Sequence, residues 1–181
     1  KVQQVGTTNY DIALNSLYRR LLSDVSLTQK IKSITDVVTE TLGADFSRIW
    51  ITRPGDLCER GCLHGSVTDG PHVCRKRSSC LHLIASSGRY THTNGGHRRV
   101  PFGAYKIGRV ASGEWSHFVT NDVVHDVRVH DHEWAERLGL VSFAGYRLVS
   151  SEGRTVGVLA MFSPKALTSS EENLRESFAA L

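Results

Sequence analysis

Apolar residues recur every three or four positions along the first forty residues, which is the period of an amphipathic helix. One stripe consists of Leu14, Leu17, Tyr18, Leu21 and Val25, and a second consists of Ile31, Ile34, Val38 and Leu42. Gly43 follows the second stripe, at the position where helices commonly end on a glycine. The pattern therefore predicts two N-terminal helices within residues 1–43.

The remaining chain alternates strand-like and helical segments. Strands are predicted at residues 46–51, 81–87, 118–120, 140–149 and 155–163, and helices at residues 103–111, 132–138 and from 168 onward. Residues 156–162 are almost continuously apolar, so this strand is expected in the middle of a sheet that is covered on both faces. The order predicts an α+β fold, a mostly antiparallel sheet of five to six strands flanked by helices.

Residues 54–80 interrupt this order with a polar, glycine-punctuated stretch that contains all four cysteines of the chain, Cys58, Cys62, Cys74 and Cys80. Loops this long inside a compact domain are usually functional or held by something. Four thiolates in so short a window can surround one ion, and zinc takes such ligands in structural sites. We therefore predict that these cysteines bind zinc, which would offset the entropy of ordering the loop.

Other interpretations of the cysteines stay open, because the spacing C-x3-C-x11-C-x5-C contains no C-x2-C pair. They are an iron–sulfur cluster, two disulfides or redox-active thiols, and unpaired cysteines. His64, His72 or His82 could replace one cysteine as a ligand, although solvated loop histidines are the simpler interpretation. The His- and Asp-rich residues 125–132 are interpreted as polar loop residues, with Asp131 as a helix N-cap.

Composition narrows the class of protein. A chain of 181 residues, 40% of them hydrophobic, suits one domain with its own core. No apolar run approaches the ~20 residues of a membrane span, and no signal peptide is evident. The absence of a targeting segment says little about the parent protein, for which a cytoplasmic location is expected. The chain begins at Lys1 without a Met, as expected of a fragment. The net charge of +4 lies partly in two short clusters, residues 75–77 and 97–99, and not in a dense basic stripe, so nucleic acid is not an expected partner.

Residues 102–181 carry several short patterns in an order that resembles the GAF domain family. They are the helix at 105–110, the aspartate-containing loop at 121–128, the strand entry at 138–142, the final hairpin at 153–159 and the start of the last helix at 167–172. An ordinary member of the family has a short turn where this chain has residues 54–80. The resemblance therefore leaves the cysteine-rich insert unexplained.

The resemblance implies a single PAS-related sensory domain over residues 1–181, with a signalling helix that begins within residues 168–181. It also implies a fused output domain, such as a histidine kinase of a two-component system or a transcriptional regulator, and a homodimer through the terminal helices. A small-molecule pocket would lie between the sheet and the middle helices. Candidate lining residues are Tyr105, Arg109, Trp115, Phe143 and Tyr146, although such aromatic residues are more often plain core.

Three functions follow from these observations. The favoured one is a non-catalytic sensory module that responds to a ligand or through a metal-bound insert. The second is an enzyme, because some proteins of the GAF fold reduce free methionine sulfoxide with loop cysteines, a chemistry that needs a low-pKa, accessible thiolate. The third is a ligand-free dimerisation module. No nucleophile elbow, H-E-x-x-H motif or phosphate loop is present in the sequence.

Overall fold

The computed structural model describes the backbone of residues 3–181 and the side chains of residues 9–181, except those of residues 170 and 174. The helices are α1 (Gln3–Leu21), α2 (Leu27–Leu42), α3 (Tyr105–Ala111), α4 (His132–Arg137) and α5 (Glu172–Ala179). The strands are β1 (Phe46–Pro54), β2 (Ser79–Gly88), β3 (Arg99–Val100), β4 (His117–Thr120), β5 (Ser142–Val149) and β6 (Thr155–Ser163). The α+β prediction is therefore confirmed.

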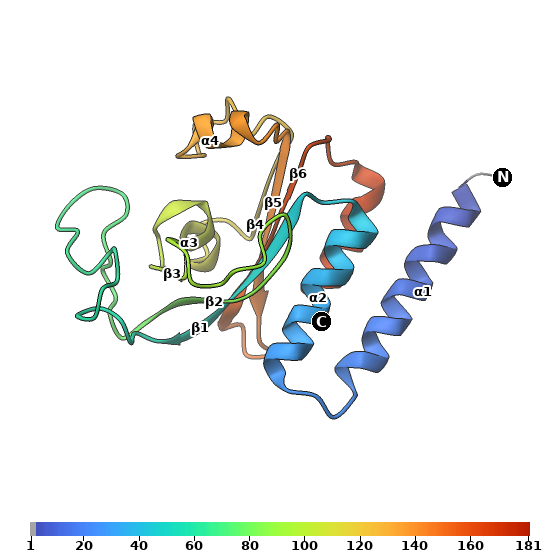
Figure 1. Cartoon of the computed structure of the whole chain (residues 1–181), viewed down its shortest axis with the longest axis horizontal. Coiled ribbons are helices and arrows are strands. Elements are labelled where there is room, and N and C mark those ends of the chain that lie inside the picture. The colour runs from blue at the N-terminus through green and yellow to red at the C-terminus, as the bar shows by residue number, and fades with distance from the viewer. Residues whose placement is uncertain (1–2) are drawn as a thin grey trace.

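All strand pairs are antiparallel, and the sheet order is β3-β2-β1-β6-β5-β4. The almost continuously apolar β6 lies between β1 and β5, as its sequence predicted. Helices α1, α2 and α5 lie on one face of the sheet, and α3 and the insert lie on the other (Figure 1). The molecule therefore has three layers with the sheet in the middle.

Alternation along the strands builds two separate cores. In β1, Phe46 and Trp50 point into the core that contains α3, whereas Ile49 points into the core under α1 and α2. In β6, Phe162 belongs to the first core and Met161 to the second. Strands β1 and β6 therefore touch both helical layers, and a displacement on one face can reach the other.

Two details differ from the sequence prediction. The last helix was predicted to begin at Thr168, but Ser169–Glu171 form a 3-10 turn and α5 begins at Glu172. Thr168 is the N-cap of this turn, with a β-region backbone and no side-chain cap hydrogen bond. Strand β3 was missed because it has only two residues, too few to show a period.

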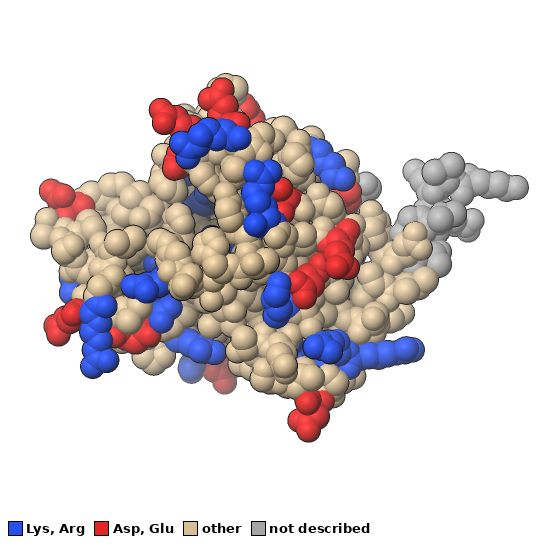
Figure 2. All heavy atoms as spheres, viewed as in Figure 1, with Lys and Arg blue, Asp and Glu red and all other residues tan. Residues whose placement is uncertain are grey.

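The insert contributes no regular structure. Residues 55–78, all of which the structure describes, contain no helix or strand, and only His64 among them is buried. Lys and Arg alternate with Asp and Glu over the face shown in Figure 2 without forming a continuous basic stripe there. Within residues 3–181, no helix combines the length and the hydropathy of a bilayer span.

Candidate functional site

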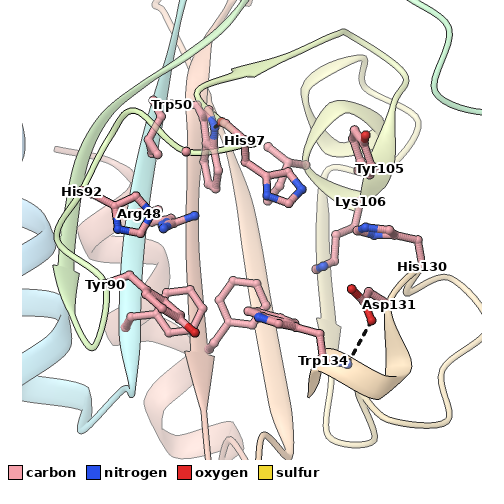
Figure 3. A pocket seen from close by; sticks show the side chains of 16 residues that line it. Arg48, Trp50, Tyr90, His92, His97, Tyr105, Lys106, His130, Asp131 and Trp134 are labelled. Atoms are coloured by element: carbon pink, nitrogen blue, oxygen red, sulfur yellow. Dashed lines mark hydrogen bonds between the residues drawn. The ribbon is translucent and has the colours of Figure 1, made fainter. Parts of the chain in front are cut away.

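A pocket of about 290 Å³ lies between the sheet and the layer that contains α3 and α4 (Figure 3). We call it the large pocket in contrast to the cavity of the insert, although a more open hollow of about 830 Å³ lies on the other face of the sheet. The strands β1 and β6 contribute Phe46, Arg48, Trp50 and Phe162. The opposite wall consists of Tyr105, Lys106, Ile107, His130, Asp131 and Trp134. The remaining lining comes from β2 and the chain that follows it, with Leu83, Tyr90, His92, Gly95, Gly96 and His97. The walls are thus mainly aromatic, with cationic and histidine side chains between the rings.

Local structure explains why the two walls face each other. Phe46, Arg48 and Trp50 are separated by two positions in β1, so they share one face of the sheet. On the opposite wall, Gly108 brings α3 close to the preceding loop, because a Cβ at this position would lie 2.2 Å from the carbonyl oxygen of Pro101. Only glycine permits this approach, which fixes α3 and with it Lys106.

Lys106 places a positive charge inside the pocket. Its side chain is only 6% exposed, and its ammonium lies 5.0 and 5.2 Å from the ring centroids of Phe143 and Phe162. Within the described part of the chain, this ammonium makes no hydrogen bond or ion pair. Burial lowers the pKa of Lys106 to about 8, and the charge of Asp131 acts in the opposite direction. Among the described residues, the only fully enclosed side-chain polar atom without a hydrogen-bond partner is Asp45 Oδ2, so the Lys106 nitrogen still reaches the space of the pocket. The lysine is thus a largely buried cation that pairs with no protein group and faces the pocket.

Arg48 brings a second cation from the opposite wall, and Figure 3 shows both cationic groups pointing into the pocket. Its Nε donates a hydrogen bond to Ser86 Oγ at 3.1 Å, and its guanidinium lies 5.6 Å from the ring centroids of Phe46 and Tyr90. Burial lowers the pKa of Arg48. The only carboxylate of the lining is Asp131, which accepts a hydrogen bond from the Trp134 amide at 2.9 Å. The pocket therefore carries a net positive charge.

Two of the lining histidines are held in the neutral form. Burial is the main cause that lowers the pKa of His97 to about 4, and nearby Lys106 adds to it. Burial likewise lowers the pKa of His130. At pH 7 His97 is therefore neutral, so its imidazole can donate one hydrogen bond and accept another without adding charge.

Tyr105 joins the pocket to the insert. Its φ of 55° is the only positive φ of a non-glycine residue in the described chain, a conformation that costs on the order of 1 kcal/mol. Four imidazoles surround its ring, with centroid distances of 3.8, 4.8, 5.4 and 5.5 Å for His72, His130, His97 and His64. The strained residue is therefore held by contacts from both the pocket and the insert.

The five residues expected from the sequence do not line one pocket. Tyr105 lines it, and Phe143 lies in the core beside Lys106 without lining it. Arg109 instead pairs with Glu114 and stacks on Trp115 at 4.0 Å from the ring centroid. Tyr146 belongs to the opposite core, because three positions separate it from Phe143 on β5.

The four cysteines meet around a second, much smaller cavity of about 10 Å³. Cys58, Cys62, Cys74 and Cys80 all line it, and all four are free thiols in this structure. Within the described residues, no three or more Cys, His, Asp or Glu side chains are grouped closely enough to hold a metal ion. The insert thus gathers the thiols at one place but does not bring the sulfur atoms to bonding distance of a common centre.

Sequence reasoning missed the charged and imidazole groups of the large pocket. Lys106 carried a signal, because it shares a helical face with buried Val110, four residues later. Arg48 carried one too, because it alternates with Phe46 and Trp50 in an apolar strand. His97 and His130 gave no signal, because they lie in irregular segments far apart in the sequence.

Comparison with known proteins adds the following. The model of the GAF domain family matches residues 26–181. The chain is similar to the solved GAF domain of a phosphoenolpyruvate-protein phosphotransferase (ptsP) from Coxiella burnetii, with 19% identity over 96% of this chain and 89% of that chain and a TM-score of 0.68. It is also similar to the A. aeolicus nlh2 GAF domain in an inactive state, with 17% identity over 96% and 91% and a TM-score of 0.63.

A third similar structure is an enzyme, the free methionine-R-sulfoxide reductase from Neisseria meningitidis in complex with its substrate. Identity is 16% over 94% of this chain and 83% of that chain, with a TM-score of 0.63. No curated protein sequence matches the chain. At such identities, these structures show a common fold.

Replacing the buried cation should stabilise the ligand-free protein. Lys106→Met removes the ammonium but keeps the side-chain volume, so at pH 7 we expect the free energy of unfolding to rise by about 1–3 kcal/mol. The matched control is Lys165→Met at an exposed lysine, for which no change beyond about 0.5 kcal/mol is expected. Urea denaturation measures both.

This gain should shrink with increasing pH. The folded pKa of Lys106, about 8, lies below the value of 10.5 for an unperturbed lysine. Between these values the unfolded wild-type chain binds a proton that the folded chain lacks, so this group makes the wild type more stable as pH rises. Met has no such dependence, so the advantage of Lys106→Met should narrow between pH 8 and pH 10. An advantage that is constant across this range would show that Lys106 has an ordinary pKa.

Proposed function

This chain belongs to the GAF domain family, and on that premise we propose that it is a non-catalytic sensory domain whose pocket binds a small organic acid. Its parent is a larger signal-transduction protein, such as a two-component histidine kinase or a transcriptional regulator. The observation that carries the proposal is the buried ammonium of Lys106, which faces the pocket without a protein partner.

The charge of the pocket favours an anion. Taking an ammonium even partly out of water is unfavourable, and neither a hydrogen bond nor an ion pair within the described chain offsets this at Lys106. A carboxylate in the pocket would form a charge-assisted hydrogen bond with Lys106, in surroundings where such a bond is stronger than in water. Arg48 on the facing wall offers a second donor to the same anion or to a second carboxylate.

The size and walls of the pocket favour a small ligand with a flat apolar part. Its volume of about 290 Å³ lies at the lower end of the range of roughly 300–1,000 Å³ for ligand pockets. Aromatic rings from both walls, among them Trp50 and Trp134, offer faces against which such a part can stack. Neutral His97 and His130 supply hydrogen bonds that orient a carbonyl or hydroxyl group of the ligand.

The thiols do not favour a reductase. A thiol-dependent reductase needs an accessible cysteine of low pKa beside its substrate, and none of the described residues that line the large pocket is a cysteine. Burial raises the pKa of Cys80 to about 11 and also raises that of Cys74. Cys62 is separated from the pocket by His64, which in turn contacts Tyr105.

The fold offers a route from the pocket to the terminal helices. Strands β1 and β6 line the pocket on one face and pack under the terminal helices on the other. Helix α5 is tied to β5 by buried Arg175, whose Nε donates to the Tyr146 hydroxyl at 2.9 Å and which also pairs with Glu172. Closure of the pocket around a ligand would move the strands against α5, and with it any domain that follows.

Matched carboxylates and amides test the proposed ligand class. Benzoate, phenylacetate and succinate are compared with benzamide, phenylacetamide and succinamide by thermal shift and calorimetry. We expect at least one acid to raise the melting temperature by several degrees while its uncharged amide does not. Lys106→Met should weaken binding of that acid at least about 30-fold, because it removes one partner of a buried charge pair.

Arg109→Met is the matched control for this experiment. It removes a cation from the same helix, but that cation pairs with Glu114 away from the pocket. This variant should bind the acid as the wild type does. The proposed ligand class is wrong if every acid behaves like its amide, or if Arg109→Met loses binding to the same extent as Lys106→Met.

Helix α1 is the proposed contact with a second copy of the chain. It packs on α2 as the outermost helix of its layer (Figure 1) and leaves apolar side chains in solvent, with exposed fractions of 61% for Ile12 and 47% for Tyr18. Leu22, directly after the helix, is 87% exposed. Pairing of two α1 helices would cover these side chains.

Charge substitutions on α1 test this pairing. Ile12→Glu combined with Leu22→Glu should convert a dimer into a monomer, because it introduces like charges into an apolar contact. Val127→Glu, at an apolar residue that is 92% exposed on a loop, should leave the dimer intact. Light scattering coupled to size-exclusion chromatography measures the mass. A wild-type chain that is monomeric at high micromolar concentration contradicts the pairing.

A further inference from the structure

The small cavity of the insert has room for at most one atom-sized guest. Its volume of about 10 Å³ approaches the ~10–15 Å³ that a single water molecule needs, so it excludes any organic ligand. Besides the four thiols, the charged side chains that line it are Arg77, Arg99 and Asp56, and Arg99 pairs with Asp56 at 2.7 Å. A soft-donor set of four sulfurs around an ion-sized space is the chemistry that selects zinc-like ions.

The insert also has few other interactions that order it. Residues 55–78 bury no hydrophobic side chain and form neither helix nor strand, although the structure describes all of them. Fixing each residue of such a loop costs roughly 1–2 kcal/mol of backbone entropy, and the main ties are a few hydrogen bonds, such as that from Arg77 to the Gly65 carbonyl. A multidentate ion is the kind of cross-link that meets this cost.

We propose that Cys58, Cys62, Cys74 and Cys80 bind one soft divalent metal ion of the zinc class, and that this ion holds the wall of the large pocket through Tyr105. Because the sulfur atoms are not yet grouped around a common centre, binding has to draw them inward around the cavity. Four thiol protons leave to solvent as four metal–sulfur bonds form. The resulting site carries a charge of −2, which Arg77 offsets in part from the cavity wall, because Arg99 is paired with Asp56.

The sequence places a histidine two positions from each of two cysteines, and both histidines contact Tyr105. His64 follows Cys62, with its Nδ1 3.8 Å from the Cys62 sulfur and its Nε2 2.9 Å from the Tyr105 hydroxyl. His72 precedes Cys74, stacks on the Tyr105 ring at 3.8 Å and accepts a hydrogen bond from the Tyr105 amide at 3.3 Å. The insert therefore grips Tyr105 at its backbone, ring and hydroxyl.

The start of helix α3 depends on these contacts of His64 and His72 with Tyr105. No side chain caps it from Ala104, the residue at its N-cap, so the first helical amide would lack a partner without His72. Metal binding also sets the direction of the hydrogen bond between His64 and Tyr105. A metal-bound Cys62 thiolate can only accept a hydrogen bond, so His64 Nδ1 donates to it. His64 Nε2 then accepts from the Tyr105 hydroxyl. Occupancy of the thiol site thus fixes both Tyr105 and the start of the helix that carries Lys106.

Metal content tests the first half of the proposal. The full 181-residue chain, purified under reducing conditions and incubated with Zn²⁺ and then desalted, should retain one ion per chain and show no thiols reactive toward a disulfide reagent. Co²⁺ in its place should give the absorption bands of a tetrahedral thiolate site. Cys58→Ser combined with Cys74→Ser should lose the ion, whereas His125→Ala, at an exposed histidine outside the insert, should keep it.

Hydrogen exchange tests the second half. Removal of the metal with a mercurial reagent and a chelator should speed amide exchange at residues 55–78 and also at residues 102–108. Exchange in β5 and β6 should not change, which shows that the sheet stays folded. Tyr105→Phe, which removes only the hydroxyl, should keep one ion per chain, yet residues 102–108 should exchange faster than in the metal-bound wild type.

The metal site and its link to Tyr105 can each be wrong independently of the other. Four reactive thiols without bound metal, or two disulfides, overturn the metal site. One bound ion whose removal leaves exchange at residues 102–108 unchanged overturns the link to Tyr105. The role of Tyr105 as a pocket wall rests on the proposed function, but neither measurement uses an organic ligand. A domain that bound no carboxylate would therefore still give these results. A domain that bound no metal would still leave the proposed ligand class to be tested by the carboxylate and amide pairs.

Discussion

A buried ammonium without a carboxylate partner is the constraint from which the functional account follows. Proteins rarely bury a lysine side chain such as that of Lys106 without an ion-pair partner, because removal of the charge from water opposes folding. The close approach of Gly108 to Pro101 fixes the helix that carries it, and the lysine faces a cavity in which the one lining carboxylate, Asp131, forms no ion pair with it. An unpaired charge that lowers the stability of the free protein, and that a ligand can pair with, is typical of binding sites, where stability and function compete.

The sheet lies between Lys106 and the terminal helices, which are the elements that could transmit ligand binding to another domain. The pocket lies on one face, the terminal helices lie on the other, and β1 and β6 contribute side chains to both. Tyr105 connects a third region, the cysteine-rich insert, to the pocket wall. In the proposed arrangement, one domain therefore combines two inputs, an organic acid in the large pocket and a metal ion in the insert, with one output face.

The sequence predicted most of the scaffold because periodicity is a local signal. The two N-terminal helices, the apolar β6 and the Asp131 cap were confirmed, since each depends on neighbours within one element. The first stripe was predicted too long, because α1 ends at Leu21, before Val25. The sequence predicted the lining of the pocket poorly, because that lining depends on which faces of distant strands, helices and loops come together. Tyr146 was placed with Phe143 although their odd spacing on β5 sends them to opposite cores. His97 and His130 meet only through the tertiary fold, which no local pattern reports.

The pKa of Lys106 itself, followed by nuclear magnetic resonance of its side-chain εCH₂ group during a pH titration, tests the central claim most directly. The account predicts a midpoint near pH 8 in the ligand-free domain, which moves upward when a bound carboxylate stabilises the ammonium. A midpoint near 10.5, unchanged by any acid, would contradict it, because the lysine would then be solvated and the pocket would have no unmatched charge to offer.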